Sequence, residues 1–150
     1  MTTLTMQNST RNITVYKLNS DYSNLNDLRD FIADKAQTFG FDADTAHLIS
    51  LAVDEACTNL IRYAYKFDKS KKIEINIKSQ QNKLIVIIKD TGKPFNPLDV
   101  PPPDMQEYFD EFKRGGLGIF IIRKVMDDVI YKPSNNEQAH NELTLLKNLL

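Results

Sequence analysis

The sequence is poor in cysteine and in long hydrophobic runs. Its single cysteine, Cys57, cannot form an internal disulfide. The start, residues 1–8, has neither the basic segment nor the apolar core of a secretory signal. Both absences favour a reducing, cytoplasmic setting. The longest purely aliphatic run, Leu84 to Ile88, is far shorter than the roughly 20 residues that cross a bilayer, which excludes a membrane span.

The chain also has little net charge. Its 19 basic and 20 acidic residues give a formal net charge of −1. We therefore expect no general attraction to nucleic acid or to an anionic membrane. What is present is 150 residues with 41% hydrophobic content, enough for one compact domain with its own core. We assign residues 1–11 to a flexible polar tail and residues 12–150 to the folded domain.

Hydrophobic periodicity predicts two consecutive helices near the start of the domain. After a modest strand signal at residues 12–18, apolar residues recur at helical spacing from Leu25 to Phe39. Gly40 can end this helix, and Asp42 or Asp44 can cap a second one that reaches Tyr65 or Lys66. The second helix has an apolar stripe formed by Ile49, Ala52, Val53, Ala56 and Leu60.

The rest of the chain alternates between extended and helical patterns. Residues 72–78 and 84–88 predict a β-hairpin, 117–126 a buried helix, and 129–132 and 142–147 two final strands. The long proline-rich segment 93–113 is typical of a functional loop. This order of elements favours an α+β fold, a two-layer α/β sandwich with a mixed, mostly antiparallel sheet and helices on one face.

Glu55 and Asn59 lie four residues apart on the second predicted helix, so they share a face. A carboxylate there can take a proton from an attacking hydroxyl, and an amide oxygen can coordinate Mg²⁺. The same spacing is also typical of a solvated helix edge, and the pair alone does not decide between the two interpretations.

Asp90 and Gly92 come directly after the apolar strand 84–88. A carboxylate at a strand end can accept a hydrogen bond from an exocyclic amine such as that of adenine, and glycine lets a flat ring approach the backbone. The alternative is an ordinary turn, for which Asp and Gly are common.

The run from Arg114 through Gly115, Gly116, Leu117 and Gly118 opens the later helix, where free N–H groups attract phosphate. The alternative there is a glycine-rich entry to a helix with Arg114 in solvent.

Other chemical patterns are missing or weak. Neither a Walker A loop nor a dinucleotide-binding fingerprint occurs. His47 and His140 have no metal-like spacing, and Cys57 is interpreted as a packing residue. Thr144, in the final predicted strand, is by itself an ordinary β-branched strand residue.

The order of these motifs is specific. A Glu-x-x-x-Asn pair on a helix, Asp-x-Gly-x-Pro after a strand and Gly-x-Gly at a later helix together resemble the GHKL, or Bergerat-fold, ATPases. Within that superfamily, the sequence from Leu51 to Asn59 and the stretch from Arg114 to Arg123 look like the anti-sigma factor serine/threonine-protein kinases. The resemblance covers the chain from about Asn12 onward and implies a histidine-kinase-like ATPase domain.

The resemblance also implies a role for each motif residue. Glu55 would be the general base and Asn59 the Mg²⁺ ligand, while Asp90, with Gly92 beside it, would recognise adenine. Contacts with the phosphates would come from Arg114 and the amides of residues 115–118, with Gly116 and Gly118 matching the phosphate-loop glycines. Thr144 matches a hydroxyl near the nucleotide, and Arg29 an arginine that contacts protein partners. The matched positions are Arg29, Glu55, Asn59, Asp90, Gly92, Arg114, Gly116, Gly118 and Thr144; Tyr63 departs from the family, which commonly has histidine there.

The resemblance thus predicts an ATP- and Mg²⁺-dependent protein serine/threonine kinase. It would phosphorylate a STAS-type anti-sigma factor antagonist, sequester a sigma factor and form a homodimer, with residues 93–113 closing over ATP. One alternative is a non-catalytic nucleotide-binding module that sequesters a partner, although binding alone needs neither Glu55 nor Arg114. Another is the catalytic domain of a histidine kinase, which would need a phosphoacceptor helix on a separate protein.

Overall fold

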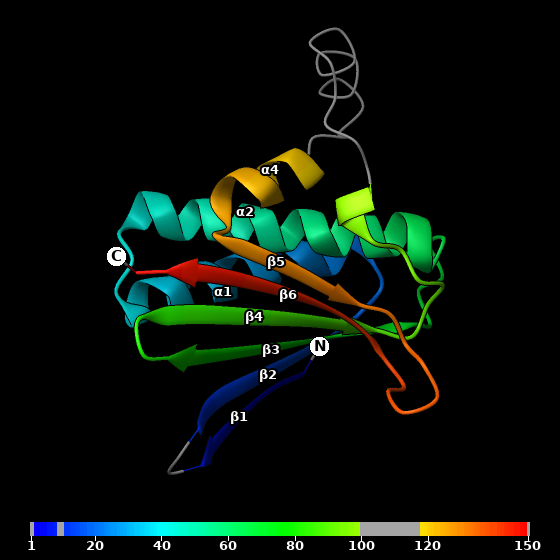
Figure 1. Ribbon diagram of the computed structural model, residues 1–150, viewed down its shortest axis with the longest axis horizontal. Helices are drawn as coiled ribbons and strands as arrows, with labels where there is room; N and C mark the ends of the chain where they lie inside the picture. The colour runs from blue at the N-terminus through cyan, green and yellow to red at the C-terminus, as the bar shows by residue number, and fades with distance from the viewer. Residues whose placement is uncertain (1, 9–10, 100–117, 150) are drawn as a thin grey trace, which may run out of the picture.

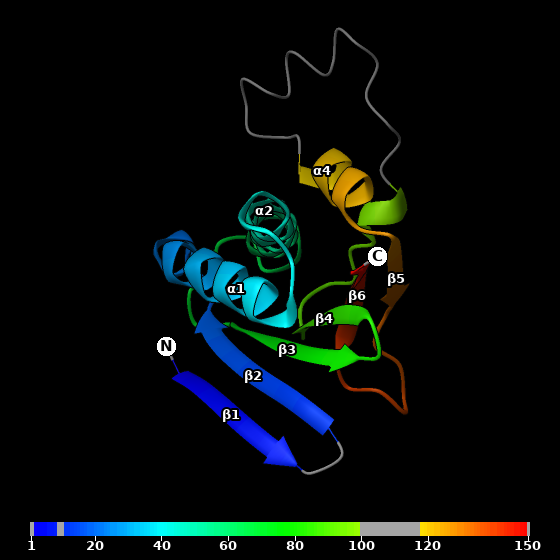
Figure 2. The same cartoon turned by 90° about the vertical axis from the view of Figure 1, so that its left-hand side faces the viewer.

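The computed structural model describes residues 2–8, 11–99 and 118–149, which form two layers (Figures 1 and 2). The helices are α1 (Leu25–Phe39), α2 (Ala43–Asn59) and α4 (Gly118–Val125), with short turns η1 (Tyr22–Asn24), η2 (Leu60–Ala64) and η3 (Pro97–Asp99). The strands are β1 (Thr2–Asn8), β2 (Arg11–Asn19), β3 (Lys72–Gln80), β4 (Lys83–Asp90), β5 (Asp128–Lys132) and β6 (Asn141–Asn148). No helix among the described residues is long and apolar enough to span a membrane.

The strands form one six-stranded sheet in the order β1-β2-β3-β4-β6-β5. Every described pairing is antiparallel. The helices α1, α2 and α4 all lie on one face of this sheet, and no described helix covers the other (Figure 2). The predicted α+β sandwich with helices on one face is therefore confirmed, but the described sheet is antiparallel throughout and not mixed.

The first strand differs from the sequence prediction. Thr2–Asn8 forms β1 and pairs with β2, so the prediction of a flexible tail is wrong for this segment. An edge strand is held by main-chain hydrogen bonds to its neighbour, and these bonds do not require an apolar composition. The alternation of Leu4 and Met6 with polar residues was the available signal for a strand.

The two long helices follow the predicted patterns closely. In α1 the stripe Leu25, Leu28, Ile32 and Ala36 is buried, and Gly40 ends the helix with a φ of 134° that disfavours other residues. Asp42 caps α2, because its Oδ1 accepts a hydrogen bond from the backbone N–H of Thr45 at 2.7 Å. The predicted stripe of α2 is buried in the core against the sheet.

The end of α2 is less regular than predicted. The α-helical part stops at Asn59, and Leu60–Ala64 continues as a turn of π-helix, closed by Tyr65 N–H donating to the carbonyl of Leu60 at 2.8 Å. Such wider turns are frequent at functional sites. The chain then turns through Lys66 and Phe67, both with positive φ, to enter β3.

Candidate functional site

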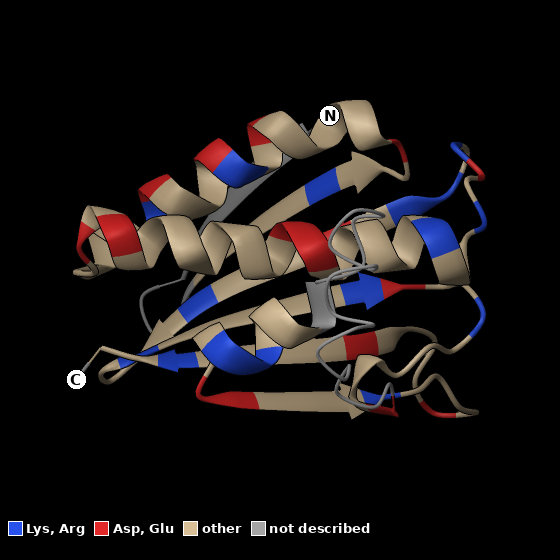
Figure 3. Ribbon diagram, turned by 90° about the horizontal axis from the view of Figure 1, so that it is seen from above, with Lys and Arg blue, Asp and Glu red and all other residues tan. Residues whose placement is uncertain are grey.

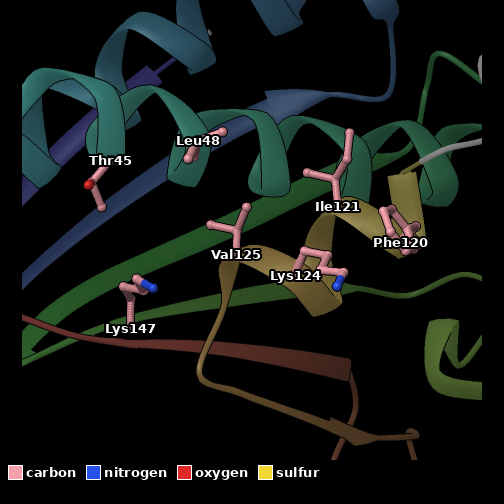
Figure 4. Close-up of a pocket in the computed structure, with 7 residues that line it drawn as sticks. All are labelled: Thr45, Leu48, Phe120, Ile121, Lys124, Val125 and Lys147. Atoms are coloured by element: carbon pink, nitrogen blue, oxygen red, sulfur yellow. The ribbon is translucent and has the colours of Figure 1, made fainter.

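Two of the hollows in the described part of the molecule are candidates for a functional site. The larger, about 350 Å³, lies between α2 and α4 (Figure 4) and is lined by Thr45, Leu48, Phe120, Ile121, Lys124, Val125 and Lys147. Its only ionisable side chains are lysines, and Lys147 lies 3.7 Å from the carboxylate of Asp127 in an ion pair. A groove without a carboxylate offers no general base, so we look to the other hollow for chemistry.

The smaller cavity brings together two of the predicted residues, Asn59 and Asp90. It lies where the end of α2 meets β4, β5 and β6, and is lined by Ala56, Asn59, Leu60, Asp90, Phe95, Pro97, Tyr131 and Leu143. Asn59 and Asp90 are distant in sequence, and the fold places both on one cavity wall. Glu55 lies one helical turn before Asn59 on α2.

Asp90 ends β4 and is held between two strands. Its side chain is only 3% exposed, and its Oδ2 accepts hydrogen bonds from Gly92 N at 2.9 Å and Asn141 Nδ2 at 3.2 Å. Burial raises the pKa of Asp90, and the hydrogen bonds from Asn141 and Gly92 oppose that rise. The carboxylate is therefore fixed in place at the edge of an apolar cavity.

Gly92 is required by a close approach of the chain to itself. A Cβ at this position would lie 2.9 Å from the carbonyl oxygen of Ala64 and 3.0 Å from Cδ1 of Tyr65. The hydroxyl of Tyr65 accepts from Thr91 N at 2.8 Å and donates to the carbonyl of Lys72 at 2.6 Å. The turn after β4 is thus packed onto the end of η2.

Asn141 is the polar residue of this site that sequence reasoning missed. It is 1% exposed, lies opposite Asp90 in the β4–β6 register, and donates to both Asp90 and the carbonyl of Gly92, the latter at 2.9 Å. Nothing in its local sequence marks it, since it follows a polar loop. Only the pairing of β4 with β6 could have pointed to it.

Glu55 and Asn59 are both half-buried on α2. Figure 3 views the helical layer face-on and shows acidic residues along α2, which lies between α1 and α4. Burial raises the pKa of Glu55, and Asp54 adds to the rise, while Arg62 and Arg29 oppose it. The Nδ2 of Asn59 is buried and has no hydrogen-bond partner in the described residues. A carboxyl with a raised pKa is suited to accept a proton near neutral pH.

Arg29 makes contacts within the fold. Its Nη1 lies 3.3 Å from Oδ2 of Asp54, whose side chain is 9% exposed, and its guanidinium also bonds Asn26. Arg29 follows Leu28 in α1 and lies at the edge of the buried stripe, on the side that faces α2. The guanidinium is still 37% exposed, and its contact with a protein partner stays a prediction.

The position predicted for Thr144 is wrong. Its neighbours Leu143 and Leu145 are buried beneath the helices, so Thr144 points to the opposite face of the sheet. It pairs there with Ile87 and Ile130. A hydroxyl on that face cannot reach the cavity beside Asp90, where Leu143 and Asn141 lie instead.

Part of the predicted phosphate site cannot be placed. Arg114, Gly115, Gly116 and Leu117 lie outside the described residues, as does the loop from residue 100 onward. Gly118 begins α4. In the part of the loop that the structure describes, Phe95 donates its N–H to the hydroxyl of Tyr131 at 3.0 Å. Phe95 also stacks on Tyr63, with ring centroids 5.0 Å apart, which gives the unusual tyrosine a packing role.

Comparison with known proteins identifies the family of the chain. A family model described as a histidine kinase-like ATPase domain matches residues 18–147. The chain belongs to this family. It is similar to the serine-protein kinase RsbW of Bacillus subtilis (strain 168), with 33% identity over 99 residues, 63% of this chain and 61% of the relative. RsbW of Listeria monocytogenes serovar 1/2a is 32% identical over 98 residues, 63% of this chain and 62% of the relative.

These matches confirm the resemblance to the GHKL ATPases and, among them, to serine-protein kinases. The alignment spans less than two thirds of the length of either relative. The ATPase domain supports the use of ATP.

Proposed function

We propose that this chain is an ATP-dependent protein serine/threonine kinase and anti-sigma factor, which phosphorylates a STAS-type antagonist and sequesters a sigma factor. The observation that carries the proposal is the cavity that joins Asn59 of α2 to Asp90 of β4, with Glu55 one turn away. The similarity to serine-protein kinases supports the choice of a hydroxyl substrate.

In this proposal the chain's own residues divide the work. Asp90 accepts a hydrogen bond from the adenine amine and so fixes the nucleotide in the cavity. Glu55 takes the proton of the attacking serine hydroxyl as its oxygen bonds to the γ-phosphorus and ADP leaves with the electrons of the broken P–O bond. Arg114 and the amides of residues 115–118 would offset charge on the transferred group. The roles of Arg114 and of these amides rest on the family resemblance alone.

Asn59 fits the role of a magnesium ligand. Its Nδ2 is buried without a partner among the described residues, and the amide oxygen beside it is the atom that would coordinate the cation. The described residues include no cluster of three or more His, Cys, Asp or Glu that could hold a metal. Mg²⁺ suits one such ligand, because it keeps several waters and binds substrate phosphates, whose charge it neutralises. We therefore assign Asn59 to Mg²⁺ when ATP is bound.

Nucleotide entry requires the cavity to open. Its present volume is about 10 Å³, room for a single water and far too little for a purine base. The lining residues from α2, β4 and β6 belong to the core of the fold, whereas Phe95 and Pro97 lie on the loop after β4. We propose that Phe95 and Pro97 move aside when ATP binds, separating the Tyr63–Phe95 stack.

The uncovered face of the sheet is our candidate for the homodimer contact. Val15, Ile87 and Ile130 lie in one row across β2, β4 and β5, with Asn76 and Thr144 between them. Ile130 is 42% exposed, and with Val15 and Ile87 it gives this face a row of apolar side chains that a second copy could cover. Sedimentation should report a dimer for the wild type and a monomer for Ile87→Asp, and a monomeric wild type would contradict this assignment.

The proposal is tested by two measurements on the purified chain. Calorimetry with ATP and Mg²⁺ should show one binding site. Incubation with labelled ATP and a STAS-domain antagonist should transfer label to one serine of the antagonist. ATP binding without transfer would instead support the non-catalytic nucleotide-binding module, and no ATP binding would contradict both functions.

A further inference from the structure

The two oxygens of Asp90 have different surroundings. Oδ2 accepts two hydrogen bonds, from Gly92 N and from Asn141 Nδ2. Oδ1 receives no hydrogen bond from the described residues, although the side chain lines the cavity. A carboxylate with one oxygen engaged and one free presents a single acceptor in a defined direction.

Asn141 is itself held so that only its amide nitrogen can face Asp90. Its Oδ1 accepts the backbone N–H of Ser134 at 2.8 Å. Its Nδ2 has two protons, and these meet Oδ2 of Asp90 at 3.2 Å and the carbonyl of Gly92 at 2.9 Å. Because a donor faces Oδ1 and two acceptors face Nδ2, the side-chain amide of Asn141 can adopt only one orientation. All of its hydrogen-bonding capacity toward this site is used.

We propose that Asn141 is a positioning residue that sets base selectivity: by engaging Oδ2 of Asp90, it leaves Oδ1 alone to accept from the 6-amino group of a purine. This inference rests on the proposed function, because it requires that Asp90 binds the base of ATP. It assigns the choice of adenine over a 6-oxopurine to Asp90 on β4 and Asn141 on the neighbouring strand β6.

The physical reason is the sign of the hydrogen bond. A 6-amino group donates to Oδ1, whereas a 6-oxo group would set a carbonyl oxygen against a carboxylate with no proton between them. A buried acceptor facing an acceptor loses its hydrogen bond and cannot turn to water. Asn141 prevents the alternative, because it stops the carboxylate from rotating and from keeping a proton on Oδ2.

The probes are ATP and inosine triphosphate, which carries a carbonyl in place of the 6-amino group. Calorimetry on the full chain gives the ratio of the two dissociation constants for the wild type, Asn141→Ala, Asn141→Asp and Asn148→Asp. Asn148 is exposed at the end of the same strand, so its variant has the same charge change away from the cavity. A ratio within one protein does not depend on the fraction that is folded.

We expect the wild type and Asn148→Asp to prefer ATP by at least about tenfold, the usual value of a hydrogen bond to a charged group. Asn141→Ala should lose most of that preference. Asn141→Asp should lose it too, because two adjacent carboxylates share a proton and the protonated one can donate to the 6-oxo group. If Asn141→Asp does not fold, Asn141→Ala alone carries the test.

The pH profile separates this role from a structural one. In Asn141→Asp, binding of inosine triphosphate should weaken as the pH rises from 5 to 8 and the shared proton is lost. The other titratable side chains near Asp90 are His140, Tyr65, Tyr131 and Cys57, and the wild-type profile measures their contribution. A wild-type ATP preference that persists in folded Asn141→Ala overturns the inference and leaves the proposed function intact. A wild type that binds neither nucleotide overturns both.

Discussion

The two ends of the candidate site are built differently. At the base end, Asp90, Gly92 and Asn141 hydrogen-bond to one another across two strands and the turn after β4. At the chemistry end, Glu55 and Asn59 project from α2 alone, and Nδ2 of Asn59 and Oδ1 of Asp54 are buried without partners in the described residues. Unpartnered buried polar groups are costly, and a bound phosphate or substrate would give the two at this end their partners.

This difference separates recognition from reaction. The hydrogen-bonded base end is organised before the nucleotide arrives, so a change there should alter affinity. The chemistry end gains its partners only with phosphate and substrate, so a change there should alter rate. Burial raises the pKa values of Asp54, Glu55 and Asp90, so ionising these carboxyls costs free energy in the folded chain.

The largest effect is expected at Glu55. Glu55→Gln removes the proton acceptor and keeps the shape of the side chain, so phosphoryl transfer should fall by about 10² to 10⁴-fold, with ATP affinity within a factor of two or three. Single-turnover transfer to the antagonist measures the rate. The matched control is Glu142→Gln, an ion-paired carboxylate of β6 near Lys89. A near wild-type rate for Glu55→Gln would make Glu55 a structural residue.

The next largest effect is expected at Asp90. Asp90→Asn puts an amide beside the amide of Asn141, so at least one donor loses its acceptor and the free Oδ1 loses its charge. The dissociation constant for ATP should rise by about 10 to 100-fold, the value of a hydrogen bond to a charged group. Calorimetry at fixed Mg²⁺ measures it. Unchanged affinity would remove adenine recognition from Asp90.

A smaller effect, on stability, is expected at the Arg29–Asp54 pair, which joins α1 to the chemistry end. Arg29→Ala leaves the buried Asp54 carboxylate unpaired and should lower the free energy of unfolding by about 1 to 2 kcal/mol, less than for a fully buried pair because the guanidinium is 37% exposed. Asp54→Asn added to Arg29→Ala should restore part of the loss. Urea unfolding of the two variants gives the answer, and additive losses would show that the pair does not couple.

The smallest effect is a pH dependence of stability. A carboxyl whose pKa is raised by folding binds its proton more tightly when folded, so its stabilisation is complete below the ordinary pKa, 4.5 for Glu, and is lost as the pH rises through the raised value. Glu55→Gln should therefore gain stability relative to the wild type between pH 4 and pH 7, by less than about 1 kcal/mol. Urea unfolding at both pH values tests this, and a relative loss would reverse the sign of the argument.

Local patterns were sufficient for the helices and for three site residues. The 3.6-residue period placed the α1 and α2 stripes, and the four-residue spacing placed Glu55 near Asn59 on one side of α2. Asp90 followed from its place at a strand end. Each of these depends only on residues close together in the sequence.

The errors have two causes: a local pattern left unused at Thr144, and distant partners that decide the roles of Asn141 and Arg29. Thr144 was assigned to the nucleotide although its neighbours Leu143 and Leu145 are the apolar positions of the strand, and alternation alone puts it on the other face. Asn141 required the β4–β6 register, which no local pattern gives. The contact of Arg29 could be predicted only by knowing that α2 packs beside α1 and places Asp54 next to Arg29.

The most direct test compares steady-state phosphorylation of the antagonist by the wild type, Glu55→Gln and Asp90→Asn over a full range of ATP concentration. The account predicts a crossed result. Glu55→Gln should lower kcat with KM for ATP nearly unchanged, and Asp90→Asn should raise KM with most of kcat recovered at saturating ATP. Equal loss of kcat in both variants, or a wild type that transfers no phosphate, would contradict the division of the site into a base end and a chemistry end.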